Sequence, residues 1–126
     1  APKLCRKVIL ATNIAETSIT VNGVRYVVDP GLVKQRTYRP KTGLESLTVV
    51  PISQAQSWQR AGRAGREASG KCFRLFTENE FDKLRPRAIP EVQRINLSEV
   101  VLQLLALGIE DVTKFDFLEP PSTASL

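Results

Sequence analysis

Histidine and methionine are absent from this sequence of 126 residues, and cysteine occurs only twice, as Cys5 and Cys72. Without histidine, and with no cysteine at a metal-ligand spacing, no zinc or other metal site is expected. Both cysteines are interpreted as reduced core residues of an intracellular protein. No apolar run approaches the length of a membrane span and no secretion signal is recognised, so neither a membrane partner nor secretion is expected.

Acidic residues are scarce in the first half of the chain. Residues 1–66 contain 11 Lys/Arg against 3 Asp/Glu, whereas residues 67–126 contain 7 against 10. We therefore expect a polyanionic partner on the first half only, and the second half has the character of a different module. With 42% hydrophobic residues, the chain can bury one core, or one core plus part of another.

The most informative stretch runs from Gln59 to Arg66 and reads Gln-Arg-Ala-Gly-Arg-Ala-Gly-Arg. Gln59, Arg63 and Arg66 recur at spacings of four and three, which predicts one shared helical face, whereas Arg60 points elsewhere. Arginine binds phosphate bidentately, glutamine can hold an attacking water, and the glycines leave room for a ligand or a second backbone. A solvated basic helix is the weaker alternative, because each glycine would cost about 1 kcal/mol there.

An apolar, β-branched run at residues 7–11 is typical of a buried strand in a parallel sheet. Small hydroxyl and amide side chains follow at residues 12–18, where open α/β sheets bind ligands. A helical turn over Asn13–Ser18 would favour phosphate, although an ordinary strand-to-helix cap explains the segment equally well. Val24–Asp29 predicts the next strand.

A β-hairpin is predicted from two β-rich segments, Leu32–Tyr38 and Leu44–Val50, which flank a five-residue turn containing glycine. Its first arm and tip carry basic residues interleaved with an aromatic one: Lys34, Arg36, Tyr38, Arg39 and Lys41. Such a pattern suits an element that tracks or wedges a nucleic-acid strand. The alternative is a charged edge hairpin that resists aggregation.

Capping and breaking residues predict the remaining elements. In chain order these are a helix from Gln54 to about Ala64 capped by Ser53, with Trp58 as core or interface packing, a strand over Lys71–Phe76, a short helix from a Thr77–Glu80 capping box to about Leu84, a proline linker, and an amphipathic helix that begins at an Asn96–Glu99 capping pattern and ends at Gly108. The last helix cannot bury its apolar face without more chain.

Taken together, these stretches resemble the DEAH-box RNA helicases of superfamily two. Residues 11–20 are similar to the fifth conserved motif of that family, residues 59–66 to its sixth, and residues 89–97 to the start of its winged-helix domain. The resemblance implies an α/β, RecA-like fold of the P-loop NTPase type, with a parallel sheet and a β-hairpin insertion. Residues 1–85 would be the later part of the second RecA-like domain, and residues 86–126 the linker and the beginning of a helical winged-helix domain.

The resemblance also implies roles for individual residues. Gln59 would position the attacking water, Arg63 and Arg66 would contact the γ-phosphate of ATP, and Thr20 and Asn22 would lie near the nucleotide. Many members have Asp where this chain has Asn22, which keeps an acceptor and loses a charge.

Other positions match the RNA side of the family. Thr12 and Asn13 would touch the RNA backbone, and the hairpin would help to separate strands. Ser18 would couple the nucleotide state to the binding of RNA.

The implied function is that of an ATP-dependent RNA helicase, which uses ATP with Mg²⁺ to translocate on or remodel RNA. No Gly-Lys-Ser/Thr loop and no Asp-Glu-Ala-His occurs, so the Mg²⁺ ligands are expected in a first RecA-like domain and this segment alone is expected to be inactive. Expected partners are RNA, the first RecA-like and C-terminal helicase domains, and activator proteins or a ribonucleoprotein complex. The expected location is intracellular, in the nucleus, with the cytoplasm as the alternative.

Two other functions remain open from the residues alone. One is a binding module for RNA or protein that has lost catalysis, although a decayed site has no reason to keep Gln59, Arg63 and Arg66 in register. The other is a DNA-directed relative, because backbone contacts carry little sequence information.

Overall fold

The computed structural model describes residues 3–125, which divide into two compact units. The first unit consists of the chain up to Lys34 together with Pro51–Arg87, and the second of Gln35–Val50 together with the chain from Ala88 onward. The outer part of the hairpin therefore groups with the C-terminal segment. The expected domain boundary after residue 85 stays a prediction.

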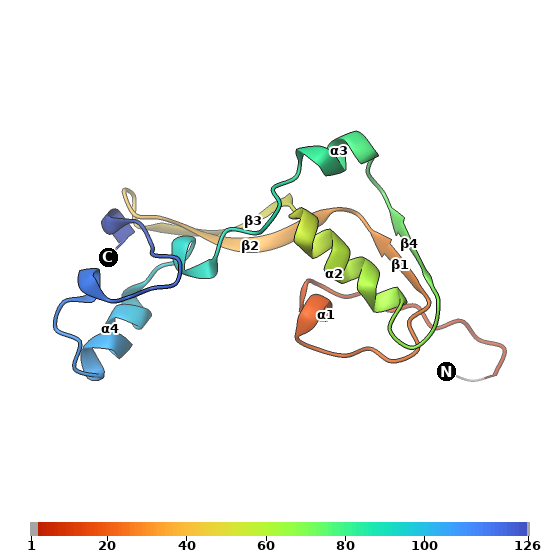
Figure 1. The fold of residues 1–126 in the computed structure, drawn as a ribbon, viewed down its shortest axis with the longest axis horizontal. Helices are drawn as coiled ribbons and strands as arrows, with labels where there is room; N and C mark the ends of the chain where they lie inside the picture. Colours follow the sequence, from red (N-terminus) through yellow and green to blue (C-terminus); the bar gives the residue numbers. More distant parts are fainter. Residues whose placement is uncertain (1–2, 126) are drawn as a thin grey trace. The chain divides into compact units, whose positions relative to one another are not determined.

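The first unit is built on a two-stranded parallel sheet (Figure 1). Strand β1 (Tyr26–Asp29) pairs with β4 (Lys71–Arg74) so that Val28 lies opposite Phe73. Helix α2 (Gln54–Ala64) contacts both strands, and the short helix α1 (Ile14–Thr17) contacts α2. This arrangement positions the candidate site, because α2 carries most of the Gln59–Arg66 motif.

Local capping signals define where two helices of this unit begin. The Ser53 hydroxyl accepts a hydrogen bond from the Gln56 amide at 3.1 Å, and the Gln56 side chain accepts one from the Ser53 amide at 2.9 Å. The same reciprocal pair joins Thr77 and Glu80 at the start of α3 (Glu78–Lys83). Both predicted caps are confirmed, although the contribution of Gln56 was not foreseen.

The predicted hairpin is confirmed as β2 (Leu32–Arg39) and β3 (Leu44–Pro51), joined by a turn in which Gly43 has a φ of 67°. The C-terminal segment contains α4 (Ser98–Ala106) and three short 3₁₀ helices, Glu91–Gln93, Val112–Lys114 and Thr123–Ser125. The backbone turns away after α4 at Gly108, whose φ is 88°, as predicted. The expected Asn96–Glu99 box does not form, because the Asn96 side chain accepts from Ser98 instead.

Two expectations about buried residues are wrong, and a third is wrong in part. Residues 7–11 form no strand, and Val8 and Leu10 are 81% and 95% exposed. A buried strand needs a neighbouring strand and a covered face, and β1 pairs here with β4 instead. Cys5 is also exposed rather than in the core, whereas Cys72 is half-buried. Trp58 is 63% exposed and packs at the surface against Phe81 and Arg74, so it does not lie in the core, whereas its alternative assignment to an interface stays a prediction.

Among residues 3–125 no helix is both long enough and apolar enough to cross a bilayer.

Candidate nucleotide and nucleic-acid site

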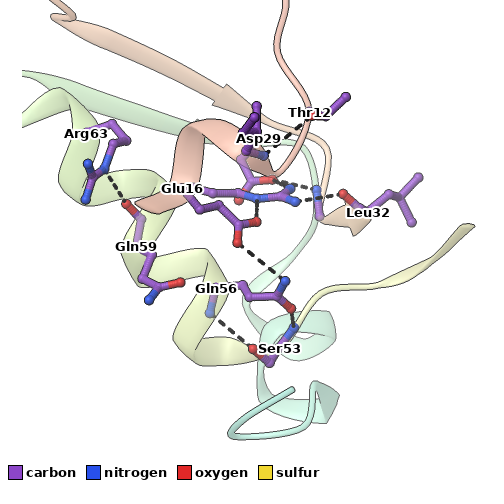
Figure 2. A network of polar contacts seen from close by, with 11 residues as sticks. Thr12, Glu16, Asp29, Leu32, Ser53, Gln56, Gln59 and Arg63 are labelled. Atoms are coloured by element: carbon purple, nitrogen blue, oxygen red, sulfur yellow. Dashed lines mark hydrogen bonds and ion pairs between the residues drawn. The ribbon is translucent and has the colours of Figure 1, made fainter. Parts of the chain in front are cut away.

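Gln59 and Arg63 lie one turn apart on α2, as their spacing predicts. The Arg63 Nε donates to the backbone oxygen of Gln59 at 3.5 Å, and both side chains are drawn on this helix in Figure 2. The expectation that Arg66 shares their helical face is wrong, because α2 ends at Ala64 with Gly65 as its C-cap. Arg66 is therefore presented by the loop that follows the helix.

Arg66 nevertheless meets another residue of the predicted nucleotide set. Its Nη1 donates to the Thr20 hydroxyl at 3.1 Å, a contact between positions 46 residues apart. The neighbouring turn is fixed as well, since the Gly23 amide donates to the Glu67 carboxylate at 3.1 Å. The fold thus brings the Thr20–Gly23 segment, with exposed Asn22, beside the end of the Gln59–Arg66 motif.

The electrostatic state of Arg63 and Arg66 differs from that of Arg60. Within the described part of the chain, no carboxylate lies within ion-pair distance of Arg63 or Arg66. Guanidinium groups without a protein counter-ion, one of them exposed and one partly buried, fit an anionic group such as a polyphosphate.

Arg60 is instead held inside a cluster of buried charges, hereafter the Arg60 cluster: Arg60, Glu16 and Asp29. Its Nε lies 2.8 Å from the Glu16 carboxylate and its Nη1 2.7 Å from that of Asp29. Its Nη2 donates to the backbone oxygen of Leu32 at 3.0 Å (Figure 2). Burial lowers the pKa of Arg60, but hydrogen bonds and charges from Asp29 and Glu16 outweigh it, so the pKa is raised above its ordinary value.

This cluster was missed by reasoning from the sequence, which assigned no partner to Arg60. The available signal was the scarcity of acids. Only three carboxylates occur in residues 1–66, and two of them bind Arg60. The third, Glu45, pairs with Arg36 at 2.8 Å.

Three predicted RNA-side and coupling residues surround α1. Thr12 and Asn13 are exposed and precede the helix, and their backbone oxygens accept from the Ala15 and Glu16 amides at 3.2 and 3.0 Å. The Asn13 side chain makes no capping bond, although Asn13 is the N-cap. Ser18 is the C-cap, and its amide donates to the Ile14 oxygen at 3.1 Å.

The predicted hairpin residues occupy β2 and its turn. Lys34, Arg36 and Tyr38 alternate along β2 and so share one face of the strand. Among the described residues, Arg36 is the only member of this set that has a carboxylate partner, Glu45. Arg39 at the end of the strand and Lys41 in the turn are exposed.

Comparison with known proteins identifies the family. The model of the helicase conserved C-terminal domain matches residues 2–68. The pre-mRNA-splicing factor ATP-dependent RNA helicase DEAH10 of Arabidopsis thaliana is 60% identical over 126 residues, which is 100% of this chain and 18% of the relative. The probable ATP-dependent RNA helicase DHX35 of Homo sapiens is 59% identical over 121 residues, covering 96% of this chain and 17% of the relative.

Solved structures agree with the sequence relatives. The Escherichia coli DEAH/RHA helicase HrpB superposes with a TM-score of 0.91 at 38% identity, over 99% of this chain and 16% of that one. The chain thus spans less than a fifth of the length of its relatives. The predicted RecA-like α/β fold and the resemblance to DEAH-box helicases are both confirmed. This chain belongs to the helicase conserved C-terminal domain family.

Proposed function

We propose that this chain is part of an ATP-dependent RNA helicase that couples ATP hydrolysis to translocation on RNA or to its remodelling. The single observation that carries the proposal is the hydrogen bond between Arg66 and Thr20, at 3.1 Å. It joins the segments that resemble the sixth and fifth helicase motifs. Arg63, on the last turn of α2, adds a second guanidinium without a carboxylate partner in the described chain.

In this proposal, Gln59 positions the attacking water, and Arg63 and Arg66 contact the γ-phosphate. A paired donor set of this kind stabilises the charge that develops on a transferring phosphoryl group. Thr20 and Asn22 lie beside the nucleotide, where the amide of Asn22 offers an acceptor without a charge. ATP with Mg²⁺ supplies the phosphoryl group when it is bound.

The residues present here do not fit a Mg²⁺ site of their own. Among residues 3–125, no group of three or more His, Cys, Asp or Glu side chains could hold a metal ion. We place the Mg²⁺ ligands in a first RecA-like domain elsewhere in the protein, so that the segment of 126 residues alone hydrolyses no ATP.

The RNA side of the proposal rests on α1 and the hairpin. Exposed Thr12 and Asn13 contact the RNA backbone, and Ser18 couples this contact to the nucleotide state. The one-signed charge on β2 and its turn suits a backbone-tracking hairpin. Residues 86–126 would begin a winged-helix domain. The splicing-factor name of the Arabidopsis relative supports RNA processing in the nucleus, within a ribonucleoprotein complex.

The test uses the full-length protein and measures RNA-stimulated ATPase activity together with nucleotide affinity. We expect Arg63→Ala and Arg66→Ala each to lower kcat by roughly a thousandfold or more, the scale of an arginine finger, while ATP still binds. Arg87→Ala is the matched control, since Arg87 is an exposed arginine of the same unit. An unchanged rate in both variants would favour the non-catalytic binding module.

A further inference from the structure

The Arg60 cluster joins three segments that lie far apart in the sequence. Glu16 comes from α1, Asp29 from the end of β1 and Arg60 from α2. Their side chains are only 9%, 0% and 14% exposed. Figure 2 shows Glu16 and Asp29 converging from separate elements beside α2.

The geometry of this cluster is strongly determined. Three nitrogens of the Arg60 guanidinium each meet a different acceptor, on Glu16, Asp29 and the Leu32 backbone. The carboxylates are held in turn, because Asp29 accepts from the Gly31 amide at 2.9 Å and Glu16 from the Gln56 side chain at 3.5 Å. A planar fork bound on three sides has one orientation, which lysine cannot reproduce.

A contribution to stability alone does not account for a buried cluster of charges at this place. Buried ion pairs often contribute no more than well-packed apolar residues of similar volume. This cluster also contains two carboxylates and one guanidinium, so it does not reach neutrality. Directional bonds specify orientation where apolar contacts do not, so the cluster fixes the register between the joined elements.

The cluster joins α1, which is proposed to lie beside RNA, to α2, which is proposed to lie beside ATP. Arg60 directly follows Gln59 and precedes Arg63 by less than one turn of α2. Glu16 lies on α1, directly after the proposed RNA contacts Thr12 and Asn13. A shift of α1 upon binding RNA would therefore be transmitted through Glu16 and Arg60 to the proposed ATP side of α2.

We propose that Arg60 is a positioning residue which, through Glu16 and Asp29, makes ATP hydrolysis on α2 responsive to RNA bound at α1. The inference rests on the proposed helicase function and deepens it. Arg60 touches neither ligand, and the cluster acts by holding α1 and α2 in one register.

The experiment compares basal and RNA-stimulated ATPase rates of the full-length protein. Glu16→Gln keeps the shape of the side chain and removes its charge. We expect the basal kcat and the KM for ATP to stay within about twofold of wild type, while the stimulation by RNA falls about tenfold. Glu78→Gln, which neutralises an exposed carboxylate on α3, is the matched control and should leave stimulation unchanged.

Arg60→Lys and the double variant complete a cycle. If both residues act through one cluster, their losses of stimulation are not additive, and the double variant resembles the more affected single one. Additive losses, or equal losses of basal and stimulated rates, would show a structural role only and overturn the proposal. Arg60→Lys, which keeps the charge, carries the same test where Glu16→Gln does not fold.

The controls separate this inference from the function on which it rests. A wild-type protein whose ATPase does not respond to RNA would refute the helicase proposal, and the coupling role with it. A wild type that responds, beside a Glu16→Gln variant that responds equally well, would refute the coupling role alone.

Discussion

In the basic first half of the chain, every carboxylate is already paired with an arginine. Glu16 and Asp29 bind Arg60, and Glu45 binds Arg36. The arginines of the Gln59–Arg66 motif therefore fall into two chemical groups, although their sequence contexts are nearly alike. One is paired with two acids of the same chain, and two have no carboxylate partner among the described residues.

The glycines of this motif allow a test at the scale of one residue. A Cβ built on Gly62 would meet no atom within 4 Å, so alanine fits the structure and should stabilise α2 by about 1 kcal/mol. We predict that Gly62→Ala slows hydrogen exchange of the α2 amides several-fold, yet lowers the RNA-stimulated ATPase rate of the full-length protein. The rate is expected to fall because the added methyl group would occupy the open space that admits a nucleotide or a second backbone.

Gly70→Ala is the contrasting variant. A Cβ there would collide with the backbone oxygens of Ala64 and Arg25, so this substitution should speed exchange in α2 and β1. An unchanged ATPase rate in Gly62→Ala would mean that the space beside Gly62 is not used.

At the scale of elements, Arg94 connects β2 to the segment that follows Pro90. Its Nη1 donates to the Arg36 oxygen at 3.1 Å and its Nε to the Ile89 oxygen at 2.9 Å. Its own backbone oxygen accepts from the Tyr38 amide at 2.6 Å. The Arg94 side chain and backbone thus bind backbone groups of the outer part of the hairpin, at Arg36 and Tyr38.

We predict that Arg94→Ala loosens the hairpin without changing the ATP site. Losing two charge-assisted bonds from a half-buried side chain should cost about 1–3 kcal/mol, which raises hydrogen exchange at Tyr38 by about 5- to 150-fold. RNA unwinding should slow while the ATPase rate persists. Arg87→Ala controls for loss of positive charge, and equal exchange in both variants would contradict the fastening role.

Elements with local signals could be predicted from the sequence, and those that depend on distant partners could not. The caps at Ser53 and Thr77 use atoms three residues apart, so the pattern contains the whole interaction. Arg60 meets Glu16 and Asp29 across 44 and 31 residues, and no local spacing encodes such a contact. The strand expected over residues 7–11 does not form for the same reason, since β-branched composition specifies a strand only where a neighbouring strand pairs with it.

At the scale of the whole molecule, one face of the β1–β4 sheet is uncovered. Asp29, which shares the α2 side, is buried, but Tyr26, Val28 and Phe73 on the opposite side are 68%, 63% and 51% exposed. Parallel sheets occur almost only with both faces covered. Because the chain spans 18% of its Arabidopsis relative, the rest of the protein can supply that cover.

We predict that Phe73 is buried in the full-length protein and exposed in the isolated segment of 126 residues. Phe73→Ser should destabilise the full-length protein by about 3–5 kcal/mol, because it removes a core aromatic, and should reduce binding of a hydrophobic dye to the isolated segment. Lys71→Ser, on the same face of the same strand, should do neither. Thermal unfolding and dye fluorescence provide the measurements. A full-length protein indifferent to Phe73→Ser would mean that this face stays open, available for a partner rather than for the protein's own remaining chain.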